Sequence, residues 1–255
     1  MIKIEGELAF LFDFDEIFVI GDLHGDFQIF KKIVEIFEKE LKRNEKVCLL
    51  FLGDYADRGD FGVEIIEGLI DLKKKYPRNV VALRGNHEVY DDLGNPKFRP
   101  CDLIYEVAEK RGIWKDYFES TLKDFFKSLP IAAIFDKILF VHGGISSKIK
   151  ELGDLINPSE IIEEDILWSD PFEGFGEYPN PRGAGVLFGR DISEKVLKSL
   201  SLEKLVRSHQ PQKATNGIFL EHEGKVITIN STRVYGGIPI ILEIRQNEIK
   251  LIRIL

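Results

Sequence analysis

The sequence predicts an α/β fold in which a parallel β–α–β half precedes a mainly antiparallel β half. Two observations support this prediction: short apolar runs alternate with helical periodicities in the first 83 residues, and closely spaced strand-like runs follow residue 204. Strands that alternate with helices are typical of parallel sheets. The 255 residues are 44% hydrophobic, and we find no repeat, low-complexity segment or linker. We therefore expect residues 1–255 to form one domain.

The elements of the first half follow from their periodicity. The apolar runs Ile17–Ile20, Cys48–Leu52 and Val80–Leu83 are each short and bounded by polar or glycine residues, which predicts three buried strands. Between them, apolar residues recur every three or four positions over 29–41 and over 62–76. That spacing predicts two amphipathic helices, so the first half should be built as strand, helix, strand, helix, strand.

The second half is expected to begin with helices and end with strands. Residues 101–128 have a helical pattern, and Gly- and Pro-rich residues 171–189 predict a long irregular loop. Turns at Glu223-Gly224 and Gln246-Asn247 predict antiparallel hairpins. The strand-like runs are 138–141, 205–207, 226–229, 238–244 and 249–254.

Composition excludes several classes of protein. The 35 basic and 43 acidic residues give a net charge of −8, which argues against a nucleic-acid-binding protein. No apolar run approaches the roughly 18 residues of a membrane helix, so no membrane partner is expected. The N-terminal 20 residues are too acidic for a signal peptide, which favours a cytoplasmic location. Two cysteines cannot supply a disulfide framework. Nothing in the sequence specifies an oligomeric state.

Metal-competent side chains follow the predicted strands, at the point where each strand ends. Because the carboxyl ends of neighbouring strands form the ligand crevice of an α/β sheet, we expect these side chains to converge. The motifs are GDLHG, GDYADRG, RGNHE, HGG and RSHQ, and the metal-competent residues within them are Asp22, His24, Asp54, Asn86, His142 and His209. Their convergence would produce a polynuclear metal site.

The types of ligand restrict the metal. Carboxylate, imidazole and amide groups without thiolate favour Mn, Fe or Zn over a soft metal. A shared carboxylate such as Asp54 can bridge two ions roughly 3.5–4 Å apart. Four of the five histidines belong to these motifs. The fifth, His222, lies near a predicted turn and is expected to be exposed.

With these motifs in this order, the sequence resembles the phosphoprotein phosphatase branch of the calcineurin-like metallophosphoesterases. The resemblance runs from about Ile17 to Gly237 and includes the stretches LPIAA at 129–133, LWSDP at 167–171 and Arg182-Gly183. It implies two mixed β-sheets packed face to face with helices outside. The LPIAA, LWSDP and RSHQ stretches are typical of serine/threonine phosphatases.

The resemblance also implies the roles of the site residues. One metal would be held by Asp22, His24 and Asp54, and the other by Asp54, Asn86, His142 and His209. Two divalent ions are therefore expected, with Mn²⁺ favoured and Fe or Zn as alternatives. His87 would act as general acid, oriented by Asp57. Arg58 and Arg182 would bind the phosphate, and Tyr235 would lie at the rim of the site.

The implied activity is metal-dependent phosphomonoester hydrolysis, with a phosphoserine or phosphothreonine protein or peptide as substrate. A hydroxide bridging the two metals would attack phosphorus directly. One alternative is a dinucleoside polyphosphate or nucleotide hydrolase that uses the same site. A second alternative is a metal-bound scaffold without catalysis. The sequence leaves the preference between phosphoserine, phosphothreonine and phosphotyrosine open.

Two segments depart from the family pattern. The loop before the last strands reads Ser-Thr-Arg-Val-Tyr-Gly over 231–236 instead of ending in the usual Ser-Ala-Pro-Asn-Tyr and Cys. Pro181 replaces the usual acidic residue before Arg182. The placement of Tyr235 and Arg182 therefore depends on segments that are particular to this chain.

Overall fold

The five-stranded sheet of the fold is built around the three strands predicted in the first half. The structure is a computed structural model that describes residues 1–245 and 248–254. In this sheet the order is β15-β14-β3-β4-β5, with β3–β4 and β4–β5 parallel and β14 antiparallel to both neighbours. The strands are β3 (Glu16–Ile20), β4 (Val47–Phe51), β5 (Val80–Ala82), β14 (Ile240–Arg245) and β15 (Glu248–Arg253).

A second mixed sheet of seven strands packs against the first. Its order is β1-β2-β6-β7-β11-β13-β12, and β7–β11 and β11–β13 are parallel. The strands are β1 (Ile2–Glu5), β2 (Leu8–Leu11), β6 (Ala132–Phe135), β7 (Ile138–Val141), β11 (Lys204–Arg207), β12 (Ile218–Glu221) and β13 (Val226–Ile229). The two mixed sheets confirm the architecture implied by the resemblance.

Alternation of side chains along the strands explains the layers. Ile17 and Val19 of β3 face the seven-stranded sheet, in a core that also holds Phe140 and Val206, whereas Phe18 and Ile20 face outward. Successive side chains of a strand point to opposite faces, so a strand that is apolar throughout must be covered on both sides. The sandwich therefore has one inner core and two outer cores under helices.

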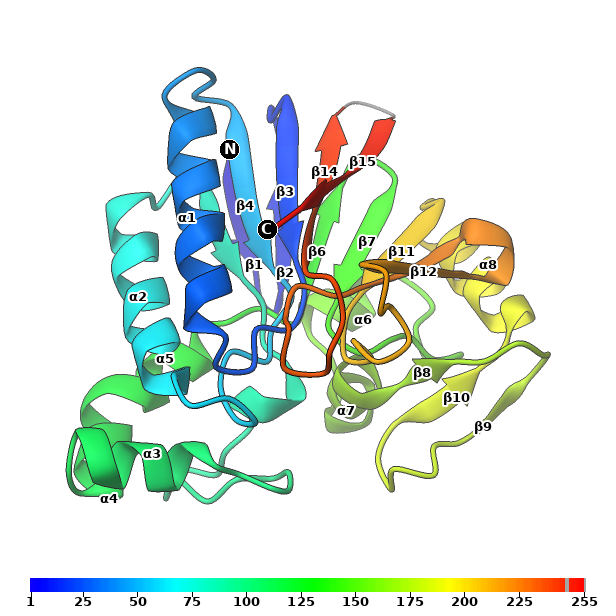
Figure 1. The fold of residues 1–255 in the computed structure, drawn as a ribbon. Helices are drawn as coiled ribbons and strands as arrows, with labels where there is room; N and C mark the ends of the chain where they lie inside the picture. The colour runs from blue at the N-terminus through cyan, green and yellow to red at the C-terminus, as the bar shows by residue number, and fades with distance from the viewer. Residues whose placement is uncertain (246–247, 255) are drawn as a thin grey trace.

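Helices cover both outer faces, as Figure 1 shows for α1 and α2 beside β4. The outer face of the seven-stranded sheet packs against α7 and α8. The helices are α1 (Phe27–Leu41), α2 (Gly62–Lys75), α3 (Leu103–Lys110), α4 (Trp114–Tyr117), α5 (Lys123–Lys127), α6 (Gly153–Ile156), α7 (Glu160–Trp168) and α8 (Arg190–Ser199); short turns are η1 (Asn86–Glu88), the π-helical η2 (Phe118–Leu122) and η3 (His222–Gly224). Among the described helices, none has the length and apolar composition needed to cross a bilayer.

The structure corrects two expectations about the second half. Residues 171–189 are not a continuous irregular loop, because β8 (Asp170–Pro171), β9 (Glu177–Pro179) and β10 (Val186–Phe188) pair in a small third sheet. The prediction of antiparallel pairing was wrong for β11, which is parallel to both neighbours. It was right for β14 and β15, although the predicted turn Gln246-Asn247 lies outside the described residues. Local turn signals cannot reveal pairing between strands that are distant in sequence.

Candidate metal centre

The six predicted metal ligands lie together at the carboxyl ends of five strands. Residues 22 and 24 follow β3, residue 54 follows β4, and residue 86 begins η1 after β5. Residues 142 and 209 follow β7 and β11 of the other sheet. All six side chains are buried: Asp22, His24, Asp54, Asn86, His142 and His209. The site thus lies where the strand ends of the two sheets meet.

His142 is at the centre of one group of ligands. Its Nδ1 is 3.0 Å from the carbonyl oxygen of Leu52 and must donate to it. When His142 is neutral, its Nε2 therefore carries a lone pair. That atom lies 2.9 Å from Oδ1 of Asn86, 3.1 Å from Nδ1 of His209 and 3.4 Å from Oδ1 of Asp54. Four electron-pair donors that converge on one point could together bind a cation.

A second group surrounds His24 and repeats this arrangement. Nδ1 of His24 is 2.9 Å from the carbonyl oxygen of Ala56 and donates to it. Nε2 then directs its lone pair toward Oδ2 of Asp22 at 3.6 Å and Oδ2 of Asp54 at 3.5 Å. A hydrogen bond from the far ring nitrogen is the usual way in which a metal-binding histidine is oriented.

Asp54 belongs to both groups because its two oxygens point in different directions. Oδ2 faces His24, whereas Oδ1 faces His142 and accepts a hydrogen bond of 3.0 Å from the backbone N–H of His87. Burial would raise the pKa of this carboxyl group, but His142, His87 and His24 hold it well below its usual range. Asp54 is therefore placed as an ionised bridge between the groups.

Unpartnered atoms show that the donor set fits metal ions. Oδ2 of Asp22 is buried and has no hydrogen-bond partner among the described residues, while Oδ1 accepts from Ser208 and from the backbone N–H of His209. Burying a carboxylate oxygen without a partner is costly. Burial would lower the pKa of His142, yet Asp54 and Asp22 raise it to about 9. The pocket therefore attracts positive charge, as a metal site must.

His87 and Asp57 form a buried pair beside these two groups. Nδ1 of His87 is 2.6 Å from Oδ2 of Asp57, and Nε2 lies 4.0 Å from Oδ2 of Asp54. Oδ1 of Asp57 accepts from the backbone N–H groups of Asp102 and Leu103. Burial opposes protonation of His87, but Asp54 and Asp57 raise its pKa above the usual value. His87 also clusters geometrically with His24 and Asp54, so position alone does not separate a ligand from an acid.

Arg58 and Tyr235 lie on the His24 side of the site. The Tyr235 ring packs edge-on against His24 with centroids 5.5 Å apart, and its hydroxyl hydrogen-bonds to Arg58. Arg58 also donates from Nη1 to the carbonyl oxygen of Pro100 at 3.2 Å. About a quarter of the Arg58 side chain is exposed, so the guanidinium borders the opening of the site.

Arg182 lies on the other side despite the departure at Pro181. Its Nε donates to Oδ2 of Asp170 at 3.0 Å. The other oxygen of Asp170 accepts from the fully buried Arg207 at 2.9 Å. Asn180 fixes the turn, because its Oδ1 accepts from the backbone N–H of Arg182. The segment around Pro181 thus still holds Arg182 against the third sheet, through Asp170 and Asn180.

The loop over 231–236, the second segment that departs from the family pattern, also forms hydrogen bonds near the site. Arg233 binds both oxygens of Asp26 through its side chain. Asp26 is the N-cap of α1, where its side chain accepts from the N–H of Ile29. Thr232 donates to the carbonyl oxygen of Leu23 at 3.0 Å. These contacts hold Tyr235 over the loop that carries His24.

Strained backbone is concentrated in the site loops. Ten non-glycine residues have positive φ in the described chain, and five of these are His24, Asp54, Asp57, Arg58 and His209. Such conformations are costly and persist where surrounding contacts enforce them. Gly53, at φ +104°, lies so close to Gly85 that a Cβ atom there would be 2.4 Å from the Gly85 nitrogen. The two loops can approach only because both positions are glycine.

Sequence reasoning overlooked Glu88 as a functional residue, although it ends the RGNHE motif. This buried carboxylate accepts hydrogen bonds from the backbone N–H groups of Asp54, Tyr55 and Gly85 at 2.8–3.0 Å. Burial and the charge of Asp54 raise its pKa to about 7. Glu88 therefore joins two loops that carry candidate metal ligands and come from different strands.

The expectation for His222 was wrong. This side chain is buried, with Nδ1 2.8 Å from the Ser193 hydroxyl and Nε2 3.0 Å from the carbonyl oxygen of Phe172. The predicted turn is present as η3, but it packs against α8 and the third sheet. His222 thus has a structural position, remote from the six ligands.

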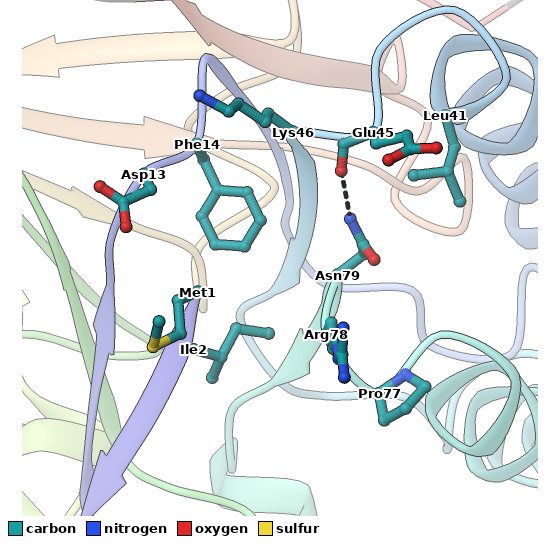
Figure 2. Close-up of a pocket in the computed structure, with 10 residues that line it drawn as sticks. All are labelled: Met1, Ile2, Asp13, Phe14, Leu41, Glu45, Lys46, Pro77, Arg78 and Asn79. Atoms are coloured by element: carbon teal, nitrogen blue, oxygen red, sulfur yellow. Dashed lines mark hydrogen bonds between the residues drawn. The ribbon is translucent and has the colours of Figure 1, made fainter.

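A large cavity at the opposite end of the strands is separate from this site. Figure 2 shows its lining, which includes Phe14, Lys46 and Asn79. These residues precede β3, β4 and β5, whereas the candidate metal ligands follow them. The cavity measures about 860 Å³ and shares no residue with the candidate metal centre.

The fold and the site together define a metal-binding protein with a buried His–Asp pair and two arginines at its opening. Residues 16–213 match the calcineurin-like phosphoesterase family. The chain therefore belongs to this family, as the motifs had predicted.

Individual relatives are protein phosphatases. The chain is 36% identical over 200 residues to a serine/threonine-protein phosphatase of Caenorhabditis elegans, a match that covers 75% of this chain and 42% of the relative. It is 33% identical over 226 residues to a PP2A-like serine/threonine-protein phosphatase of Candida albicans, covering 85% of this chain and 51% of that protein. The chain thus spans about half the length of the curated relatives it matches.

A solved structure extends the similarity to the fold. A protein serine/threonine phosphatase from Saccharomyces cerevisiae, described as similar to human phosphatase PP5, superimposes with a TM-score of 0.78 at 27% identity. The alignment covers 98% of this chain and 84% of the yeast chain.

Proposed function

We propose that this protein is a metal-dependent phosphomonoesterase that dephosphorylates phosphoserine and phosphothreonine residues of proteins. The observation that carries the proposal is the position of Asp54, whose two oxygens face two separate groups of metal-competent side chains beside His87. The protein phosphatases among its relatives support the choice of substrate.

The donor set supports two divalent ions. Asp22, His24 and Asp54 would hold one, and Asp54, Asn86, His142 and His209 the other. Ligands of this kind suit Mn²⁺, with Fe or Zn as alternatives. When bound, the ions would supply Lewis-acid stabilisation of the phosphoryl oxygens and a water nucleophile that is reactive near neutral pH.

The protein's own residues would position the phosphate and protonate the leaving group. Arg58 and Arg182 approach the centre from opposite sides, which suits two guanidinium groups that bind phosphoryl oxygens. Tyr235 would hold Arg58 in place through its hydroxyl group.

The leaving alkoxide of a phosphoserine needs a proton, and Nε2 of His87 would donate it. Asp57 would fix the tautomer by accepting from Nδ1. Asp22 offers an unpartnered oxygen to the His24 group, which therefore has Asp22, His24 and Asp54 as donors without His87. This supports His87 as acid rather than ligand.

We also propose that residues 1–255 act as a single catalytic domain. Ligands come from β3, β4 and β5 of one sheet and from β7 and β11 of the other, so the centre requires both sheets. The cytoplasmic location expected from the N-terminal composition stays a prediction.

Metal analysis combined with a substrate panel tests the proposed function. Purified protein should contain two metal ions per chain and hydrolyse phosphoserine and phosphothreonine peptides faster than phosphotyrosine peptides. Diadenosine tetraphosphate in the same panel tests the nucleotide-hydrolase alternative. A kcat/KM higher for this compound than for the phosphopeptides would contradict a protein substrate. Absence of p-nitrophenyl phosphate hydrolysis with Mn, Co, Ni and Zn would instead support a non-catalytic scaffold.

A further inference from the structure

A groove of about 660 Å³ opens beside the metal centre, between two segments that are distant in sequence. Residues 96–99 form one wall, and Trp168 with residues 182–184 forms the other. The Phe98 ring packs on His87 with centroids 4.4 Å apart, and the Trp168 ring packs edge-on against His209 at 5.7 Å. Each wall therefore touches a histidine of the site, so a chain lying in the groove would pass the reacting phosphate.

The first wall presents two cations toward solvent. Phe98 is buried, whereas its neighbours Lys97 and Arg99 are exposed. This alternation is that of an extended segment anchored by its central side chain. A backbone hydrogen bond of 2.9 Å from Lys97 to the carbonyl oxygen of Val89 fixes the segment further. The backbone that carries the two cations is thus held beside His87.

These cations lack acidic partners in the described part of the chain. Neither Lys97 nor Arg99 forms an ion pair there. Asp91 is the carboxylate that interacts with Lys97 over distance. It is engaged by the backbone of Leu93 and by Asn95.

The opposite wall adds further unsatisfied donors. Arg182 uses Nε for Asp170, and its two terminal nitrogens have no partner among the described residues. No aspartate or glutamate lines the groove. The groove has three cationic side chains and no carboxylate, so it is locally positive although the chain as a whole has a net charge of −8.

We propose that this groove selects phosphoprotein segments that carry acidic residues next to the phosphorylated residue. The inference rests on the proposed function and specifies its substrate class. Lys97 and Arg99 would attract the flanking carboxylates, while Arg182 remains available for the phosphate. Because the cations are solvent-exposed, the selectivity should be modest and should weaken as salt is added.

The test compares two phosphoserine peptides that differ only in having aspartate or serine on both sides of the phosphoserine. With the Mn²⁺-loaded full chain, kcat/KM should be about threefold to tenfold higher for the acidic peptide. Lys97→Ala/Arg99→Ala should bring the ratio to about one, and Lys97→Glu/Arg99→Glu should reverse it. The matched control Lys198→Ala/Arg78→Ala removes the same charges from exposed positions outside the groove and should leave the ratio unchanged.

The possible outcomes separate this inference from the proposed function. If both peptides are hydrolysed but their ratio does not respond to the Lys97 and Arg99 substitutions, the groove inference is wrong and the proposed function stands. If p-nitrophenyl phosphate is hydrolysed but neither peptide is, both are wrong. Thermal unfolding of each variant identifies any loss of fold, and the charge-reversal variant provides a gain of preference that misfolding cannot mimic.

Discussion

The two ends of the parallel strands β3, β4 and β5 belong to the same sheet but differ in whether their charged residues are buried or exposed. At the carboxyl ends, Asp22, Asp54 and Asn86 are buried, and one oxygen of Asp22 has no hydrogen-bond partner in the described part of the chain. At the amino ends, Asp15 and Lys46 are exposed and lie 4.0 Å apart. The large cavity at the amino ends has rim charges of both signs (Figure 2). Cavity size therefore does not identify the functional end of these three strands, whereas the buried, unpartnered oxygen of Asp22 does.

Each end of the strands also has a buried glutamate whose pKa is raised to about 7, mainly by burial. Glu88, at the carboxyl ends, is held by three backbone N–H groups of the site loops. Glu16, at the amino end of β3, pairs with Arg245 on the neighbouring strand β14 at 2.8 Å. Glu88 joins loops that carry candidate metal ligands, whereas Glu16 joins two strands. Substitutions at the two ends should consequently differ in what they change.

The largest expected effect is that of Asp54→Asn. The substitution removes the charge that faces both groups of ligands, so metal and phosphatase activity should be lost together. Metal analysis and p-nitrophenyl phosphate hydrolysis measure the two losses. Asp15→Asn, at the other end of the sheet, serves as control and should retain both. An Asp54→Asn variant with full metal content would contradict the bridging role.

His87→Asn should separate metal binding from catalysis at the carboxyl ends. We expect kcat on a phosphoserine peptide to fall by about 10²- to 10⁴-fold, because the leaving group loses its proton donor. Two metals per chain should remain. Wild-type turnover in this variant would rule out the general-acid role, and loss of metal would assign His87 to the ligands instead.

Glu88→Ala should reduce stability at the functional end. It leaves three buried backbone N–H groups without an acceptor, which should lower the free energy of unfolding by about 3 kcal/mol or more. Urea denaturation at pH 8 measures the change, and the exposed Glu45→Ala is the control from the amino ends. A change as small as that of the control would show that these loops do not depend on Glu88.

Glu16→Gln should have the smallest effect, and this effect should depend on pH. Its pKa is raised from 4.5 to about 7, so between these values the folded chain keeps a proton that the unfolded chain has released. Stability gained from this proton is complete below pH 4.5 and is lost as pH rises through about 7. Glu16→Gln should remove that decline, whereas Glu45→Gln should not. An identical decline in wild type and Glu16→Gln would assign it to another group.

The sequence was informative wherever function depends on short motifs. Residues 22 and 24 share one loop, and residues 54, 57 and 58 share another, so their proximity could be predicted from spacing. It was less informative where partners are distant in sequence. Nothing local indicated that Asp170 would join Arg182 to the buried Arg207, or that Phe98 would pack on His87. These contacts exist only after the strands have paired.

The amino-acid sequence by itself determined the alternation of strands and helices in the first half and the types of ligand at the strand ends. Apolar periodicity and glycine-framed motifs are local properties, and they act over a few residues. The tertiary structure alone decided that β11 is parallel to β7 and β13, which brings His209 to within 3.1 Å of His142. It also decided the charge of the groove beside the site. Both results depend on packing between residues that are far apart in the chain, and local propensity does not encode that packing.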